Sequence, residues 1–133
     1  MASLRGREEA RSLEVTGLGV LWVRQQGFTI DRPQGLGDDY LLLRFYTPMS
    51  ILTADGLTDG EPGDCLLYDP TFPQWYTGRG VGFIDDWLRV TPSGMPELVC
   101  RYGVPLNTLF RPRKLDFFSP TLEAIGAELR RRE

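Results

Sequence analysis

The chain contains no histidine, so any chemistry it performs must use other side chains. Histidine is the commonest general base and the commonest metal ligand in proteins. Adjacent aspartates occur at Asp38–Asp39 and Asp85–Asp86. Neighbouring residues of a strand point to opposite faces, so neither pair is expected to form a carboxylate cage for a hard metal ion. We therefore expect no catalytic residues, no metal site and no cofactor.

Asp85 and Asp86 directly precede Trp87 and allow two interpretations. They could act as a carboxylate pair in acid–base chemistry. Alternatively, they stand at a bulge or loop end, where Asp side chains accept hydrogen bonds from nearby backbone N–H groups. The second interpretation is favoured.

Tryptophan and arginine side chains give the sequence its potential for binding. Trp22, Trp75 and Trp87 offer flat faces on which a sugar can stack, although filling a core is the commoner use of tryptophan. Trp22 and Arg24 share one face of a predicted strand. An arginine beside an aromatic ring suits a sugar or a carboxylate.

Arg44 and Tyr46 share a strand face with Tyr40. If this face lines a barrel, Arg44 needs an anionic or hydroxylated ligand as its partner, because an unpaired buried charge is costly. The alternative is an outward face in water. The predicted ligand-binding residues are Trp22, Arg24, Arg44, Tyr46, Trp75 and Trp87.

Short strands are the expected elements of most of the chain. Fifteen glycines and ten prolines punctuate its 133 residues, which favours strands over long helices. Asp55-Gly56 between apolar runs predicts a hairpin, and residues 31–39 have the composition of a loop. The apolar strand over 18–23 is expected to be covered on both faces. The further predicted strands are 40–46, 49–53, 64–68, 74–76 and 82–91.

The pattern divides the chain into three parts: a flexible polar arm over 1–16, a barrel over 17–92 and a helical segment over 93–133. Residues 95–102 are predicted to form a short helix that ends at Gly103. Ser119-Pro120 predicts the start of a second helix. Its apolar stripe is expected either to pack on the outside of the barrel or to form a subunit interface. The stripe consists of Leu122, Ile125 and Leu129.

Composition limits the partners and the compartment. The net charge of −3 lacks the basic excess of a stand-alone nucleic-acid binder. Cys65 and Cys100 lack metal-type spacing and are expected to be two buried free thiols. No apolar run reaches the length of a membrane span. We expect a cytoplasmic protein that does not bind a membrane.

A recognisable signature lies over residues 60–76. Pro62-Gly63-Asp64 forms a turn before a predicted strand, and Pro73-Gln74 follows that strand. The segment resembles the central signature of cupin barrels, in which a Pro-Gly-Asp turn precedes a strand and a Pro-His pair. Here Gln74 stands at the histidine position.

Further segments make the resemblance more specific, and together they cover about residues 17 to 130. They occur in the order seen in sensor domains of AraC-family transcription regulators. The matching segments are Phe28-Thr-Ile-Asp-Arg-Pro33, Asp39-Tyr-Leu-Leu-Leu43, Pro73-Gln-Trp-Tyr76, Asp85-Asp-Trp87 and Gly103-Val-Pro-Leu-Asn107.

The resemblance implies a mainly β fold, a cupin-like double-stranded β-helix (jelly-roll) barrel followed by C-terminal α-helices. The metal-free barrel would bind a small-molecule effector such as a sugar, and Leu122, Ile125 and Leu129 would lie in a homodimer interface. In the family a helix-turn-helix domain follows and binds DNA, and we expect such a domain to be absent from this chain. Effector binding would change how the helices present that domain. The alternatives are a metal-independent cupin enzyme acting on a sugar and a ligand-free assembly module.

Overall fold

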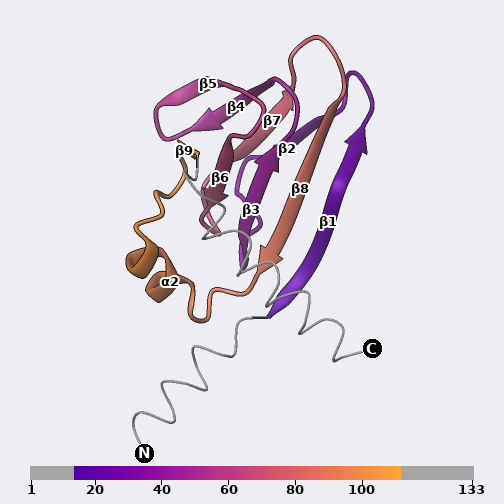
Figure 1. Cartoon of the computed structure of the whole chain (residues 1–133). Coiled ribbons are helices and arrows are strands. Elements are labelled where there is room, and N and C mark those ends of the chain that lie inside the picture. The colour runs from indigo at the N-terminus through magenta and orange to yellow at the C-terminus, as the bar shows by residue number, and fades with distance from the viewer. Residues whose placement is uncertain (1–13, 112–133) are drawn as a thin grey trace, which may run out of the picture.

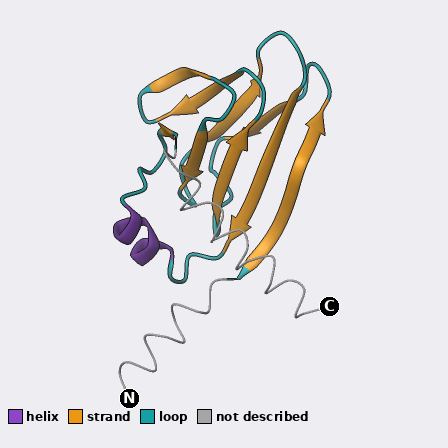
Figure 2. Ribbon diagram, viewed as in Figure 1, coloured by secondary structure: helices purple, strands orange, loops and turns teal. Residues whose placement is uncertain are grey.

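The computed structural model describes residues 14–111, and these form a mainly β fold of two antiparallel sheets (Figures 1 and 2). The five-stranded sheet has the strand order β1-β8-β3-β6-β9, and the four-stranded sheet has the order β2-β7-β4-β5. The strands are β1 (Val15–Arg24), β2 (Thr29–Arg32), β3 (Tyr40–Phe45), β4 (Met49–Thr53), β5 (Gly56–Gly60), β6 (Cys65–Tyr68), β7 (Gln74–Gly78), β8 (Phe83–Val90) and β9 (Leu109–Phe110).

The main core lies between the two sheets, as the alternation along β3 illustrates. Leu41, Leu43 and Phe45 point toward the four-stranded sheet and are at most 2% exposed. Burial of such a side chain contributes roughly 1.5–3 kcal/mol. Both sheets supply this core, which contains Ile30, Leu41, Leu43, Phe45, Met49, Ile51, Leu66, Tyr68, Tyr76 and Phe83.

A second apolar cluster covers the outer face of the five-stranded sheet. Leu42 and Leu88 lie on this face, and Met95 of α2 (Met95–Tyr102) packs against them. The helix has Pro96 in its first turn and ends at Gly103, whose φ of 63° is the left-handed conformation of a helix C-cap. The predicted helix over 95–102 is therefore confirmed, and it explains why β3 is buried on both faces.

Several predicted strands are present where the alternation was clear. Strand β3 covers the predicted segment 40–46 almost entirely, and β4 matches 49–53. The Asp55-Gly56 turn joins β4 to β5, with Gly56 at a φ of 97° that suits glycine. Strand β8 fills the predicted segment 82–91. The hairpin and these strands are confirmed.

Three elements differ from the predictions. The loop predicted over 31–39 was placed too early, because Asp31 and Arg32 complete β2 by pairing with β7. Strand β1 begins at Val15, inside the predicted flexible arm. Residues Leu109–Phe110, predicted within a helical segment, form β9 and pair with β6. These pairings join segments far apart in the sequence, so local patterns carry little information about them.

Strand β1 also corrects the expectation of a strand covered on both faces. Within residues 14–111 it is an edge strand that pairs only with β8, and Val20 and Val23 are 61% and 70% exposed. A register shift lies between Gly19 and Trp22, where Leu21 has a φ of 49°. The apolar run was mistaken for a buried strand because edge position depends on topology.

Asn107 fixes the segment between α2 and β9. Its side chain accepts a hydrogen bond from the Asp69 N–H and donates one to the Asp69 carboxylate, both at 3.0 Å. Its backbone N–H donates to the Leu67 carbonyl at 2.8 Å. Its φ of 61° is a conformation that asparagine tolerates better than most residues. The Gly103–Asn107 segment thus has a structural role.

The remaining expectations concern thiols, helices and the C-terminal segment. Cys65 and Cys100 are both free, as predicted, but Cys100 is exposed rather than buried because it lies on the outer side of α2.

Within residues 14–111 no helix is long and apolar enough to cross a membrane. The second predicted helix, with Leu122, Ile125 and Leu129, lies outside the described residues.

Candidate ligand-binding site

Strand β8 brings a carboxylate into the space between the sheets. Phe83, Asp85 and Trp87 lie on its inner face, since Phe83 belongs to the main core and the three alternate along the strand. Asp85 pairs with Phe45 of β3 on one side and with Trp22 of β1 on the other. The carboxylate therefore lies among aromatic side chains.

Asp85 is fully buried and unpaired. Its exposed fraction is 0%, and neither carboxylate oxygen has a hydrogen-bond partner among the described residues. Burial raises the pKa of Asp85 to about 6, and the charge of Arg24 opposes part of that rise. Buried carboxylates are normally hydrogen-bonded, so an unpaired one needs an explanation.

The four-stranded sheet contributes a second unpaired polar group. Gln74 of β7 is 0% exposed and lies across from Arg32 of β2, on the same inner face as Tyr76. The Arg32 guanidinium donates a hydrogen bond to Gln74 Oε1 at 3.0 Å. Gln74 Nε2 has no acceptor among the described residues. One end of this amide is held in place, and the other is free to donate.

Tyr76 electrostatically links the polar groups of the two sheets. Its hydroxyl is buried, which raises its pKa to about 12, and the nearby charge of Asp85 adds to this rise. Arg32 and Arg24 lie close enough to lower the same pKa. The charges of Asp85, Arg32 and Arg24 therefore all act on the Tyr76 hydroxyl.

Trp22, Arg24 and Trp87 form an aromatic and cationic wall beside Asp85, at the solvent-facing edge of the space between the sheets, where Trp22 is 46% exposed and Arg24 and Trp87 are half-buried. The two indole rings are 6.0 Å apart in an edge-to-face arrangement, and the Arg24 guanidinium carbon lies 5.6 Å from the Trp22 ring centre. Trp87 lies flat against Gly19, where a Cβ atom would collide with its indole nitrogen. Trp87 Nε1 and Arg24 Nε are buried without partners among the described residues.

We call this set the interior polar cluster: Trp22, Arg24, Arg32, Gln74, Asp85 and Trp87. Asp85 supplies two acceptor oxygens, while Gln74 Nε2, Trp87 Nε1 and Arg24 Nε supply donors. Hydroxyl groups can both donate to the carboxylate and accept from these donors. The indole rings add flat apolar surface. The cluster thus has the composition of a site for a small polar molecule that carries hydroxyl groups.

The neighbouring carboxylate, Asp86, lies on the outer face of β8 and is fully engaged. It accepts a hydrogen bond from the Leu21 N–H at 2.7 Å and one from the Tyr46 hydroxyl at 2.6 Å. Leu21 lies at the register shift of β1. The predicted role of an Asp at a bulge, bonding backbone N–H groups, is therefore confirmed for Asp86 and does not describe Asp85.

Three of the predicted ligand-binding residues are apart from the cluster. Arg44 pairs with Asp86 across β3 and β8, so it lies on the outer face, where its guanidinium carbon is 5.4 Å from the Tyr46 ring centre. Trp75 pairs with Asp31 on the outer face of the four-stranded sheet. The structure brings Trp22, Arg24 and Trp87 together on the inner side of β1 and β8, with Trp22 46% exposed and the other two half-buried, and places Arg44, Tyr46 and Trp75 on the outer faces.

A second carboxylate near the interior provides a contrast to Asp85. Asp39 is 8% exposed, accepts a hydrogen bond from the Thr16 hydroxyl at 2.6 Å and forms an ion pair with Arg89 at 3.7 Å. Its charge is therefore compensated within the chain. Asp85 has no such partner among the described residues, so the two buried carboxylates differ in whether their polar atoms are satisfied.

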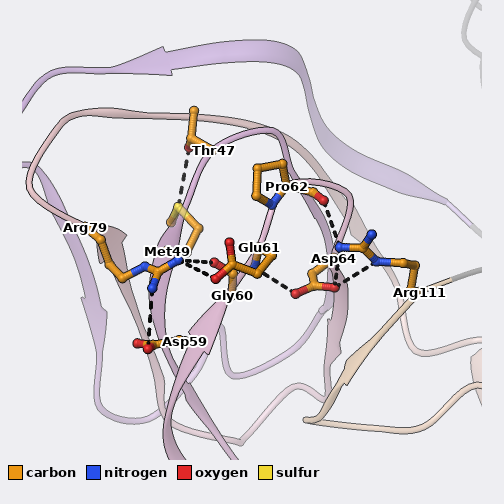
Figure 3. A network of polar contacts seen from close by, with 9 residues as sticks. All are labelled: Thr47, Met49, Asp59, Gly60, Glu61, Pro62, Asp64, Arg79 and Arg111. Carbon is orange, nitrogen blue, oxygen red and sulfur yellow. Dashed lines mark hydrogen bonds and ion pairs between the residues drawn. The ribbon is translucent and has the colours of Figure 1, made fainter.

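The Pro62-Gly63-Asp64 turn of the cupin-like signature is held by polar contacts (Figure 3). Arg111 donates to the Pro62 carbonyl at 2.9 Å and pairs with Asp64 at 3.3 Å. On the other side, Arg79 pairs with Glu61 at 2.6 Å and with Asp59 at 3.4 Å. These groups are exposed or half-buried and satisfied by one another, so they position the turn and are not candidates for a ligand.

Sequence reasoning gave no ligand role to three members of the cluster: Arg32, Gln74 and Asp85. Gln74 stood at the histidine position of the cupin-like signature, and this position could have indicated that its side chain points inward. Arg32 had no local signal, because its inward orientation depends on pairing between β2 and β7. Asp85 was assigned to backbone bonding together with Asp86, but the two point to opposite faces.

Within residues 14–111 no group of three or more His, Cys, Asp or Glu side chains is arranged to hold a metal ion. No protein-family model matches the chain, and no curated protein matches it.

Proposed function

We propose that this domain binds a small hydroxylated molecule between its two sheets, through the interior polar cluster. The observation that carries the proposal is Asp85, a fully buried carboxylate whose oxygens both lack partners among the described residues. Leaving a buried polar group unsatisfied costs about 1–3 kcal/mol, and more for a charge. A ligand that donates hydroxyl groups to Asp85 would remove this cost.

The strand orders support a cupin-like jelly roll as the finer fold. Its two sheets contain β1-β8-β3-β6 and β2-β7-β4-β5, the arrangement expected when eight strands are wound as two Greek keys. In this proposal Gln74 takes the place of a metal-binding histidine, and Arg32 holds its amide. The site would then bind its ligand by hydrogen bonds without a metal.

We propose further that ligand binding is a signal in an AraC-like transcription regulator. The support is the order of matching segments between residues 28 and 107. In this proposal the C-terminal segment with Leu122, Ile125 and Leu129 forms a homodimer, and an attached helix-turn-helix domain binds DNA. A ligand that prefers one conformation of the barrel shifts the arrangement of that dimer.

A thermal-shift screen tests the binding proposal. The chain is heated with sugars, sugar acids, amino acids and divalent metals, with EDTA as a control. A ligand at a hundredfold excess over its Kd stabilises the native state by about 2.7 kcal/mol. We expect a saturable shift that is insensitive to EDTA and lost in Asp85→Asn. A shift with metal alone contradicts a metal-free site, and no shift with any compound contradicts the proposal and favours a ligand-free assembly module.

A second candidate function is acid–base catalysis on a sugar. It is favoured by one observation, the pKa of Asp85, which burial raises to about 6 in a region shared with Tyr76. Incubation of the chain with each bound sugar, followed by NMR of the sugar, tests it. Turnover that Asp85→Asn abolishes supports an enzyme, and unchanged sugar supports a binding domain.

A further inference from the structure

The charges of the interior polar cluster are unequal. The half-buried Arg24 and Arg32 face the space between the sheets, one from each sheet, whereas the fully buried Asp85 is the one carboxylate among them. The other carboxylate of this face, Asp39, already pairs with Arg89. Two half-buried guanidinium groups thus flank one ionisable buried carboxylate, and this local excess of positive charge favours an anion beside Arg24.

Arg24 is held in place by two aromatic rings and forms no close ion pair. Its guanidinium carbon lies 5.6 Å from the Trp22 ring centre and 5.0 Å from the Phe28 ring centre. The charge of Arg24 acts on Asp85 without an ion pair between them, and Arg24 Nε is buried without an acceptor among the described residues. Stacking on two rings reduces the conformational freedom of the guanidinium, so its donors are prearranged for a planar carboxylate.

The remaining groups require hydroxyls rather than a second anion. Asp85 repels an anion at close range and accepts hydrogen bonds through both oxygens. Gln74 lies on the four-stranded sheet, across from the sheet of Asp85, and its Nε2 needs a neutral or anionic acceptor. A ligand with hydroxyl groups next to Asp85 and Gln74, and with a carboxylate next to Arg24, satisfies all three. The Trp22 ring offers a surface for the C–H face of a sugar ring.

Resting on the proposed function, we propose that the ligand is a sugar acid, a polyhydroxylated carboxylate, and that Arg24 binds its carboxylate while Asp85 binds its hydroxyls. A neutral sugar of the same shape leaves Arg24 without an anion. A simple carboxylic acid without hydroxyls leaves Asp85 without donors. Selectivity for the sugar acid over both follows from these two residues.

Calorimetric titration of matched compounds tests the assignment. The full chain is titrated with D-glucuronate, D-galacturonate, D-gluconate and D-galactonate, and separately with D-glucose and D-galactose, at about pH 7.5, where carboxylic acids are ionised. We expect at least one acid to bind about tenfold or more tightly than its neutral parent, as a charge-assisted hydrogen bond provides.

Variants assign this preference to Arg24. Arg24→Gln is expected to remove the preference, and Arg24→Lys to keep part of it because the charge remains. Arg101→Gln is the control, because it deletes the same charge from the exposed end of α2. Circular dichroism and thermal unfolding establish that each variant is folded before titration.

The outcomes separate this inference from the proposed function. A neutral parent that binds as tightly as its acid overturns the sugar-acid assignment and leaves small-molecule binding in place. An acid preference that survives in folded Arg24→Gln overturns the role of Arg24. Absence of binding by every acid and every sugar of this set overturns the assignment and, together with a negative thermal-shift screen, the proposed function as well.

Discussion

Asp85 and Asp86 are neighbours on β8, yet their carboxylates lie on opposite faces of the five-stranded sheet and have opposite hydrogen-bonding states. Asp86 accepts two hydrogen bonds on the outer face, from Leu21 and Tyr46. Asp85 is buried between the sheets, and neither of its oxygens has a partner among the described residues. The alternation of a strand thus places one of two identical residues in a hydrogen-bonded position and the other in a buried position without a partner among the described residues.

The pH dependence of stability should identify Asp85 as a destabilising charge. Its pKa in the folded protein is raised from 3.8 to about 6, so the folded state binds the proton more tightly than the unfolded chain. The contribution of Asp85 to the free energy of unfolding therefore falls as the pH rises from about 4 to about 6, and it stays constant at higher pH.

Asp85→Asn removes this contribution. A shift of about 2 pKa units corresponds to about 3 kcal/mol, so the variant should exceed the wild type by up to about 3 kcal/mol above pH ~7 and match it near pH ~4. Urea unfolding across this pH range measures the difference. Equal pH profiles for the two proteins would contradict the burial of an unpaired carboxylate. A variant that is more stable but binds no ligand is expected of a functional site.

The Tyr46–Asp86 hydrogen bond should stabilise the outer face. Tyr46→Phe removes a half-buried donor 2.6 Å from a carboxylate and should cost about 1–2 kcal/mol. A double-mutant cycle with Asp86→Asn, measured by urea unfolding, isolates the pair. Strictly additive effects of the two substitutions would show that the contact contributes nothing to stability.

Gly19 should be required for the position of Trp87. A Cβ atom at this residue would collide with the indole ring, so Gly19→Ala must displace Trp87 from the wall of the cluster. We expect a loss of about 1–3 kcal/mol in stability, as in other overpacked sites, together with weaker ligand binding. Val20→Ala is the control, because Val20 is 61% exposed and its truncation should change stability by less than about 0.5 kcal/mol. A Gly19→Ala protein that matches this control would refute the contact.

Two substitutions of Asn107 should separate its hydrogen bonds from its backbone conformation. Asn107→Gly keeps access to the φ of 61° but loses both bonds to Asp69, so a cost of about 1–2 kcal/mol is expected. Asn107→Ala should cost about 1 kcal/mol more, because alanine is strained in the left-handed conformation. Thermal unfolding of both proteins measures this, and an alanine variant as stable as the glycine variant would show that no strain is present.

The sequence predicted the parts of the fold that depend on local patterns. Alternation marked β3, Asp55-Gly56 marked a hairpin, and Gly103 marked the end of α2. It did not predict β2 or β9, which exist through pairing with β7 and β6. The exposure of β1 was missed for the same reason, since an apolar run does not reveal whether a second neighbour covers it.

The candidate site was predictable only where its residues share a strand. Trp22 and Arg24 were assigned to one face from their spacing, and they do lie together. Arg32 and Gln74 join Asp85 only after two sheets fold against each other. Arg44 and Trp75 alternate out of the interior, and a strand pattern alone does not say which of its two faces is inside.

The indole N–H signals of the three tryptophans provide the most direct test of a ligand site between the sheets. The ¹⁵N-labelled chain is titrated with the tightest-binding compound of the screen, and Trp22→Phe, Trp75→Phe and Trp87→Phe assign the signals. We expect the signals of Trp22 and Trp87 to shift with saturation, and that of Trp75, on the outer face, to remain in place. A bound compound that shifts Trp75 alone, or none of the three, would contradict binding at the interior polar cluster.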